Sequence, residues 1–167
     1  MSATPQNIDL IKEQIAYLES QSTLIHEYVG RADAKASWIF AASGAVSVYD
    51  LSSLDKFLAQ NQHSLAIAVS LALGLFLIAA LKCFHAIFPR TNANPSGLRF
   101  FGSVAKISSA ESFSNRISKL SLIEVRDEIA RHNFEASKIG AAKFESVSSA
   151  GVFSLCGALL SAVILFL

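Results

Sequence analysis

Three charged side chains, those of Arg31, Asp33 and Lys35, come just before an apolar run, and they are suited to holding an anion. Arg offers a bidentate fork of N–H donors to phosphate or carboxylate groups, and Lys offers a point charge. The same two cations can instead extend to lipid head groups at a membrane surface. A carboxylate gains nothing from anionic head groups, so Asp33 needs a cationic partner. The stretch therefore indicates either an anion site or an interfacial charge belt.

A second polar stretch, RHNFEASKIGAAKF at 131–144, comes before another apolar run. The apolar residues around it recur at helical spacing, which places His132, Asn133 and Lys143 on or near the packing face of a helix. A polar side chain on such a face must be paired or must face a cavity. We therefore expect the polar groups of both stretches to converge on a small anionic ligand in a pocket close to the membrane.

A purely structural explanation of the same residues stays open. Asn133 can fix the register of two packed helices, and Lys143 can form an ion pair with Asp33 or Glu27 at the same depth. The polar residues would then serve helix register and lipid contact. Under this alternative the protein is a ligand-independent oligomeric membrane scaffold or a small channel subunit.

The sequence carries no pattern typical of an enzyme. It contains no GxxxxGK[ST], GxGxxG, HExxH or GxSxG motif. Its cysteines, Cys83 and Cys156, have neither CxxC nor Cys/His ligand spacing. We therefore expect no catalytic residues, no metal, no cofactor and no nucleic-acid partner.

The elements that carry these side chains are predicted to be membrane helices. The chain is 52% hydrophobic and only 16% charged, with a mean hydropathy of +0.44, whereas soluble domains average about 25% charged residues. A helix needs about 20 residues to cross a bilayer core of roughly 30 Å. Uncharged runs at 57–81 and 146–167 reach that length. The run at 36–49 spans only if its helix continues through Leu54 or its flanking charges snorkel.

The distribution of positive charge predicts the orientation, because cytoplasmic loops near spans retain Lys and Arg. Of the 14 Lys and Arg residues, only Lys56 falls in the loop between the first two spans. The N-terminus is therefore expected in the cytoplasm and the C-terminus outside. The expected segments are a cytoplasmic stalk helix at 1–33, a first span at 34–54, a short external loop at 55–63, a second span at 64–87, a cytoplasmic helical segment at 88–145 and a third span at 146–167.

Two long helices are expected to run from the cytoplasm into the membrane, because 7–54 and 120–167 contain no proline. A shorter amphipathic helix is predicted at 99–119, after a proline-containing break at 88–97. The predicted fold is an all-α membrane protein, with three transmembrane helices and long helices extended into a cytoplasmic helical bundle. Pairs of small residues, such as Gly157 with Ser161, favour close helix approach and indicate a homo-oligomer.

The order of these features resembles the PycTM membrane effectors of the Pycsar anti-phage system, over about residues 22–167. The features are DAKAS before the first span, FPR after the second, and NFEASKIGAAKF before the last. The resemblance implies a bacterial inner-membrane effector of abortive infection. It also implies activation by cyclic UMP or cyclic CMP from a partner pyrimidine cyclase, followed by loss of membrane integrity.

The resemblance also implies roles for individual residues. The family-like patterns are DxKA, from Asp33, and the set Asn133, Ser137 and Lys143. These residues would sense the nucleotide or couple its binding to the spans. Lys and Arg suit the phosphate, while Asn, Ser or a carboxylate suits a pyrimidine edge. No strand-rich segment is predicted, so helices must form the site. The predicted ligand-binding residues are Arg31, Asp33, Lys35, His132, Asn133, Ser137 and Lys143.

Overall fold

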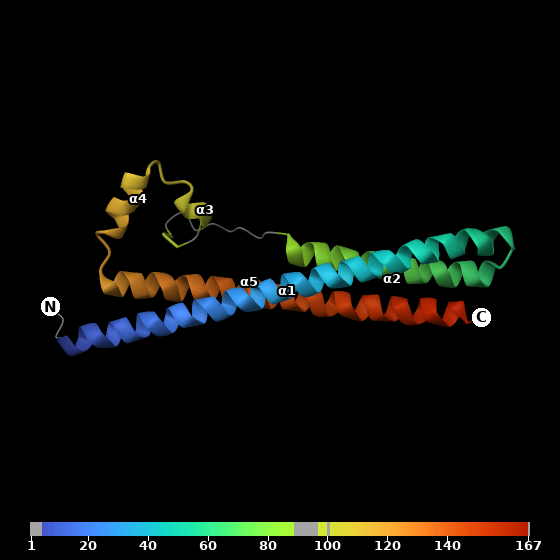
Figure 1. Cartoon of the computed structure of the whole chain (residues 1–167), viewed down its shortest axis with the longest axis horizontal. Coiled ribbons are helices and arrows are strands. Elements are labelled where there is room, and N and C mark those ends of the chain that lie inside the picture. The colour runs from blue at the N-terminus through green and yellow to red at the C-terminus, as the bar shows by residue number, and fades with distance from the viewer. Residues whose placement is uncertain (1–4, 89–96, 100, 167) are drawn as a thin grey trace. The chain divides into compact units, whose positions relative to one another are not determined.

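The computed structural model describes residues 5–88, 97–99 and 101–166, and every regular element in these ranges is an α-helix (Figure 1). The all-α prediction is thus confirmed for the described residues. Most of the proline-containing break predicted at 88–97 lies outside them. The helices are α1 (Pro5–Ala59), α2 (His63–Ile87), α3 (Phe101–Val104), α4 (Ala110–Ile117) and α5 (Leu122–Leu165).

The chain divides into two compact units, and both α1 and α5 contribute to each. Unit 1 comprises Met1–Tyr28 and Pro89–Gly140. Unit 2 comprises Val29–Phe88 and Ala141–Leu167.

Unit 2 packs its parts of α1, α2 and α5 together through small side chains. Many large apolar side chains point outward, although Phe76 and Val69 are buried: Trp38 is 77% exposed and Val48 is 70% exposed. This pattern inverts that of a soluble protein, whose core is built from large apolar residues, and it is typical of membrane helices that approach through small residues. The buried core of unit 2 contains Ala32, Ala36, Cys83, Ala86, Val147 and Ala150.

Two helices, α2 and α5, are long and apolar enough to cross a membrane. Only 28% of the apolar window of each is buried, whereas a core helix of a soluble protein is mostly buried. Both helices are therefore candidate membrane spans. The span predicted at 64–87 falls within α2, and the span predicted at 146–167 falls within α5 as far as Leu165.

Helix α1 continues without a break through the segment predicted as the first span and ends at Ala59. The connection to α2 is only residues 60–62, shorter than the loop predicted at 55–63. Asn61 adopts φ 58° there, a left-handed conformation that Asn tolerates better than most residues. The tight turn brings α2 back along α1 within unit 2 (Figure 1).

Unit 1 contains the first parts of α1 and α5 lying side by side (Figure 1). Ile129 of α5 is fully buried and Ile11 of α1 is 5% exposed. A capping box fixes the start of α5: Ser121 N–H donates to Glu124 Oε2 at 2.7 Å, and Glu124 N–H donates to Ser121 Oγ at 3.3 Å.

The prediction of one amphipathic helix at 99–119 is wrong. Two short helices, α3 and α4, occupy the segment instead. Ser109 begins a new helix because it is in an extended conformation and its side chain accepts a hydrogen bond from Ser112 N–H. Ser109 is therefore the N-cap of α4.

Candidate functional site

The seven residues predicted to bind ligand fall into two groups, one in each unit. The group in unit 2 is Arg31, Asp33, Lys35 and Lys143, and the group in unit 1 is His132, Asn133 and Ser137.

In unit 2, Lys143 and Asp33 form an ion pair between α5 and α1. Lys143 Nζ lies 2.6 Å from Asp33 Oδ1 and 2.8 Å from Oδ2. The side chains are 13% exposed for Lys143 and 38% exposed for Asp33. This is the pairing that the structural alternative predicted. In the described state Lys143 is therefore neutralised, and an anion reaches it only by displacing the Asp33 carboxylate.

The other two cations of this group lie on the exposed surface of α1. Lys35 Nζ is 6.0 Å from the ring centroid of Phe144, at the outer limit of a cation–π interaction. Arg31 is exposed one turn earlier along α1. Arg31, Lys35 and Lys143 together carry three positive charges against the one negative charge of Asp33.

In unit 1, Asn133 is buried, with 3% of its surface exposed. Its Nδ2 donates to the backbone oxygen of Leu18 at 2.8 Å and to Gln21 Oε1 at 3.2 Å. Both partners are acceptors, so the amide nitrogen must face α1. Within the described part of the chain, Asn133 Oδ1 has no hydrogen-bond partner. A buried amide oxygen without a hydrogen-bond partner lowers stability. It can accept a hydrogen bond from a ligand.

His132 lies beside His26, with the two ring centroids 5.8 Å apart. Burial lowers the pKa of His132, and the charges of His26 and Arg99 lower it further, against a smaller opposing effect of Glu128. The imidazole is therefore neutral at physiological pH and can accept a hydrogen bond. Ser137 is exposed, and no hydrogen bond among the described residues joins it to this group.

Stability should depend on pH through His132. The folded state binds fewer protons than the unfolded chain, because the pKa of His132 is lowered on folding. Stability is therefore full above about pH 6.5, the ordinary histidine pKa, and falls as the pH drops from there to the folded-state pKa. We expect His132→Gln to reduce the difference in thermal midpoint between about pH 8 and about pH 5.5. His63→Gln, at an exposed histidine of α2, is the control, and an equal reduction there would contradict the assignment.

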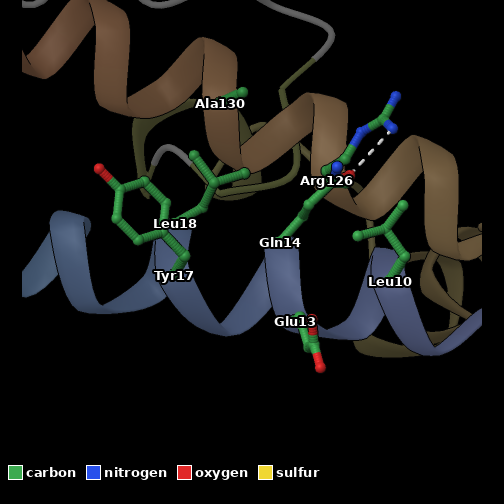
Figure 2. A pocket seen from close by; sticks show the side chains of 7 residues that line it. All are labelled: Leu10, Glu13, Gln14, Tyr17, Leu18, Arg126 and Ala130. Atoms are coloured by element: carbon green, nitrogen blue, oxygen red, sulfur yellow. Dashed lines mark hydrogen bonds between the residues drawn. The ribbon is translucent and has the colours of Figure 1, made fainter.

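A groove of about 400 Å³ lies between α1 and α5 within unit 1, as Figure 2 shows. Arg126 Nη1 donates to Gln14 Oε1 at 3.3 Å. The guanidinium is already held by Asp127, whose Oδ1 accepts at 2.6 Å and 2.8 Å, so an anion gains less here than beside an unpaired cation. The groove is lined by Leu10, Glu13, Gln14, Tyr17, Leu18, Arg126 and Ala130.

Sequence reasoning did not identify this groove. The polar side chains that line it lie at ordinary surface positions of amphipathic helices, and only the pairing of α1 with α5 brings Gln14 and Arg126 together. The 112-residue separation of these two residues leaves no local signal in the sequence.

The family model PycTM, described as the Pycsar effector protein domain, matches residues 17–167. This match confirms the resemblance predicted from the sequence. No curated protein matches the chain, and no solved structure matches it.

Proposed function

The chain belongs to the PycTM family of Pycsar anti-phage effectors, and from this premise we propose that it is the nucleotide-triggered membrane effector of such a system. It binds cyclic CMP or cyclic UMP from a partner pyrimidine cyclase and then impairs the bacterial inner membrane. The observation that carries the proposal is the packing of unit 2, in which most buried residues are small and many large apolar residues lie outside. A chain of this family built in that way acts within the lipid bilayer.

We propose three spans rather than two, with α1 crossing at 34–54. The support is the outer surface of α1 in unit 2, where Trp38, Phe40 and Val48 are exposed as the large apolar residues of α2 and α5 are. The positive charges then put the N-terminus in the cytoplasm and the C-terminus outside. Unit 1 would form the cytoplasmic helical bundle.

The phosphate of the nucleotide is assigned to the cations of unit 2. An incoming phosphate competes with the Asp33 carboxylate for Lys143, while Arg31 and Lys35 add positive charge. Displacement of Asp33 removes the ion pair that joins α1 to α5. The ligand must bind the separated arrangement more tightly than the paired one for this to activate the protein.

The residues of unit 1 remain predicted ligand contacts because of their own chemistry. Asn133 Oδ1 is an acceptor without a partner in the described structure. It is of the type that accepts the imide N–H of uracil or the amino group of cytosine. His132, kept neutral by its lowered pKa, is a further acceptor, and Ser137 offers a hydroxyl group.

We also propose a homo-oligomer, but its subunits do not meet through the pairs of small residues that the sequence suggested. Ser43 and Ser154 bond to each other within unit 2, with their Oγ atoms 2.9 Å apart. Gly157 is in contact with Phe76. These small residues therefore pack helices of a single subunit, and contacts between subunits are assigned to the exposed apolar faces.

A second candidate function is a ligand-independent scaffold or small channel subunit. The Lys143–Asp33 ion pair and the bond from Asn133 to Leu18 favour it, because both are the contacts expected of residues that only fix helix register. The two functions differ in whether a nucleotide binds.

The test is a calorimetric titration of the detergent-solubilised protein with cyclic CMP, cyclic UMP and, as control, cyclic AMP. We expect saturable binding of one or both pyrimidine nucleotides and none of cyclic AMP. A well-folded protein that binds none of the three would favour the scaffold.

A further inference from the structure

Asp50 is a buried acidic residue within unit 2, on a helix that we propose to span the membrane. Only 2% of its surface is exposed, and Ser161, which is 8% exposed, donates to its Oδ2 at 2.7 Å. The Ser161 hydroxyl also lies 3.0 Å from the backbone oxygen of Gly157, and its single proton serves one acceptor at a time. An acidic side chain is costly within a bilayer and usually has a function there.

Asp50 is part of a line of polar contacts between α1 and α5 in unit 2. The line begins with the Asp33–Lys143 ion pair, continues through the bond between Ser43 and Ser154, and ends with the bond between Asp50 and Ser161. We call these six residues the polar seam. From Asp33 to Asp50 the helix rises about 26 Å at 1.5 Å per residue, close to the roughly 30 Å of a bilayer core.

We infer that the polar seam is a closed route for monovalent cations, and that Asp50 makes it selective for cations over anions once α1 and α5 separate. The inference rests on the proposed function, since it specifies how membrane integrity is lost. Hydroxyl groups of Ser43, Ser154 and Ser161 replace part of the hydration shell of an ion. Acidic side chains in a pore favour cations, as they do in the selectivity filters of cation channels.

The chemistry of the polar seam distinguishes the cation route from a structural latch, by which we mean a seam that only holds α1 and α5 together. The Ser161 hydroxyl needs only an acceptor, and an asparagine amide oxygen at position 50 would accept as well as a carboxylate does. A latch therefore tolerates Asp50→Asn, whereas a cation route loses its selectivity. Asp50→Glu retains the charge and should retain the selectivity.

The experiment measures currents through planar bilayers that contain the full-length protein, with unequal KCl on the two sides. The reversal potential gives the ratio of cation to anion permeability. We expect the wild type to prefer K⁺ and Asp50→Asn to lower the ratio by about tenfold, the lower end of what a charged cleft contributes to local ion concentration. Asp55→Asn removes the same charge at an exposed position of α1 and should leave the ratio unchanged.

Currents are recorded with and without cyclic CMP or cyclic UMP, so that the two proposals are tested separately. A selective current that needs no nucleotide, with the ratio lowered in Asp50→Asn, supports the cation route and contradicts nucleotide activation. A nucleotide-dependent current that is not cation-selective, or whose ratio is unchanged in Asp50→Asn, overturns the route and leaves activation supported. No current from inserted protein also overturns the route, and nucleotide-dependent release of a large dye from vesicles then decides on activation.

Discussion

Lys143→Ala is expected to abolish the binding of cyclic CMP and cyclic UMP while the protein still inserts into membranes and assembles. Lys143 is the cation of unit 2 for which the phosphate is proposed to compete, and its ammonium group now lies 2.6 Å from Asp33 Oδ1. Removing it takes away both the phosphate contact and the ion pair. The measurement is the calorimetric titration, with assembly followed by size-exclusion chromatography.

Lys138→Ala is the matched control, because Lys138 is a 60% exposed lysine of the same helix. Binding should be unchanged in that variant. Loss of assembly in Lys143→Ala, or undiminished binding, would contradict the proposed role of Lys143.

The two partners of the ion pair should differ in their effect on stability. Asp33→Ala leaves the ammonium group of Lys143, a side chain that is only 13% exposed, whereas Lys143→Ala leaves a carboxylate that is 38% exposed and partly hydrated. A buried group without its partner costs about 1–3 kcal/mol. Asp33→Ala should therefore lower the thermal midpoint more than Lys143→Ala does.

Gly157→Ala is expected to destabilise unit 2, although alanine is normally the better helix former. A Cβ atom at position 157 would lie 3.0 Å from two ring atoms of Phe76, and that ring is 2% exposed. Phe76 has little room to move, so α2 must shift away from α5. Overpacking of this kind costs about 1–3 kcal/mol. Thermal unfolding in detergent measures the loss.

Gly151→Ala is the control on the same helix, because a Cβ atom there meets only Ile39 Cδ1 at 3.8 Å, an ordinary contact. That variant should gain about 0.5–1 kcal/mol from the higher helix propensity of alanine. Phe76→Leu should restore part of the stability lost in Gly157→Ala by making room beside position 157. Equal effects of the two glycine substitutions would contradict the close approach of α2 and α5.

Much of the fold could be predicted from the sequence, because its main signals are local. The proline-free stretches predicted two long helices, which are α1 and α5, and apolar runs predicted the candidate spans in α2 and α5. The break between α3 and α4 was missed. Ser109 caps the second helix there through one side-chain bond, and other serines of the described chain, such as Ser43 and Ser146, lie inside helices without ending them.

The candidate site was predictable only as far as polarity on an apolar helix face allows. That reasoning identified Asp33, Lys143 and Asn133, and it anticipated the ion pair as one of two outcomes. It overlooked Asp50, which directly follows the apolar run at 36–49. The bond from Ser161 to Asp50 joins residues 111 apart in sequence, and only the packing of α1 on α5 reveals that the carboxylate is buried.

The central claim is that a cyclic pyrimidine nucleotide makes this protein breach a membrane. The most direct measurement is the release of K⁺, with a proton carrier present to balance charge, from vesicles that contain the purified protein, on addition of cyclic CMP, cyclic UMP or cyclic AMP. We predict release with at least one of the pyrimidine nucleotides and none with cyclic AMP or from protein-free vesicles. Retention of K⁺ with both pyrimidine nucleotides, when the protein is shown to be inserted and folded, would contradict the claim.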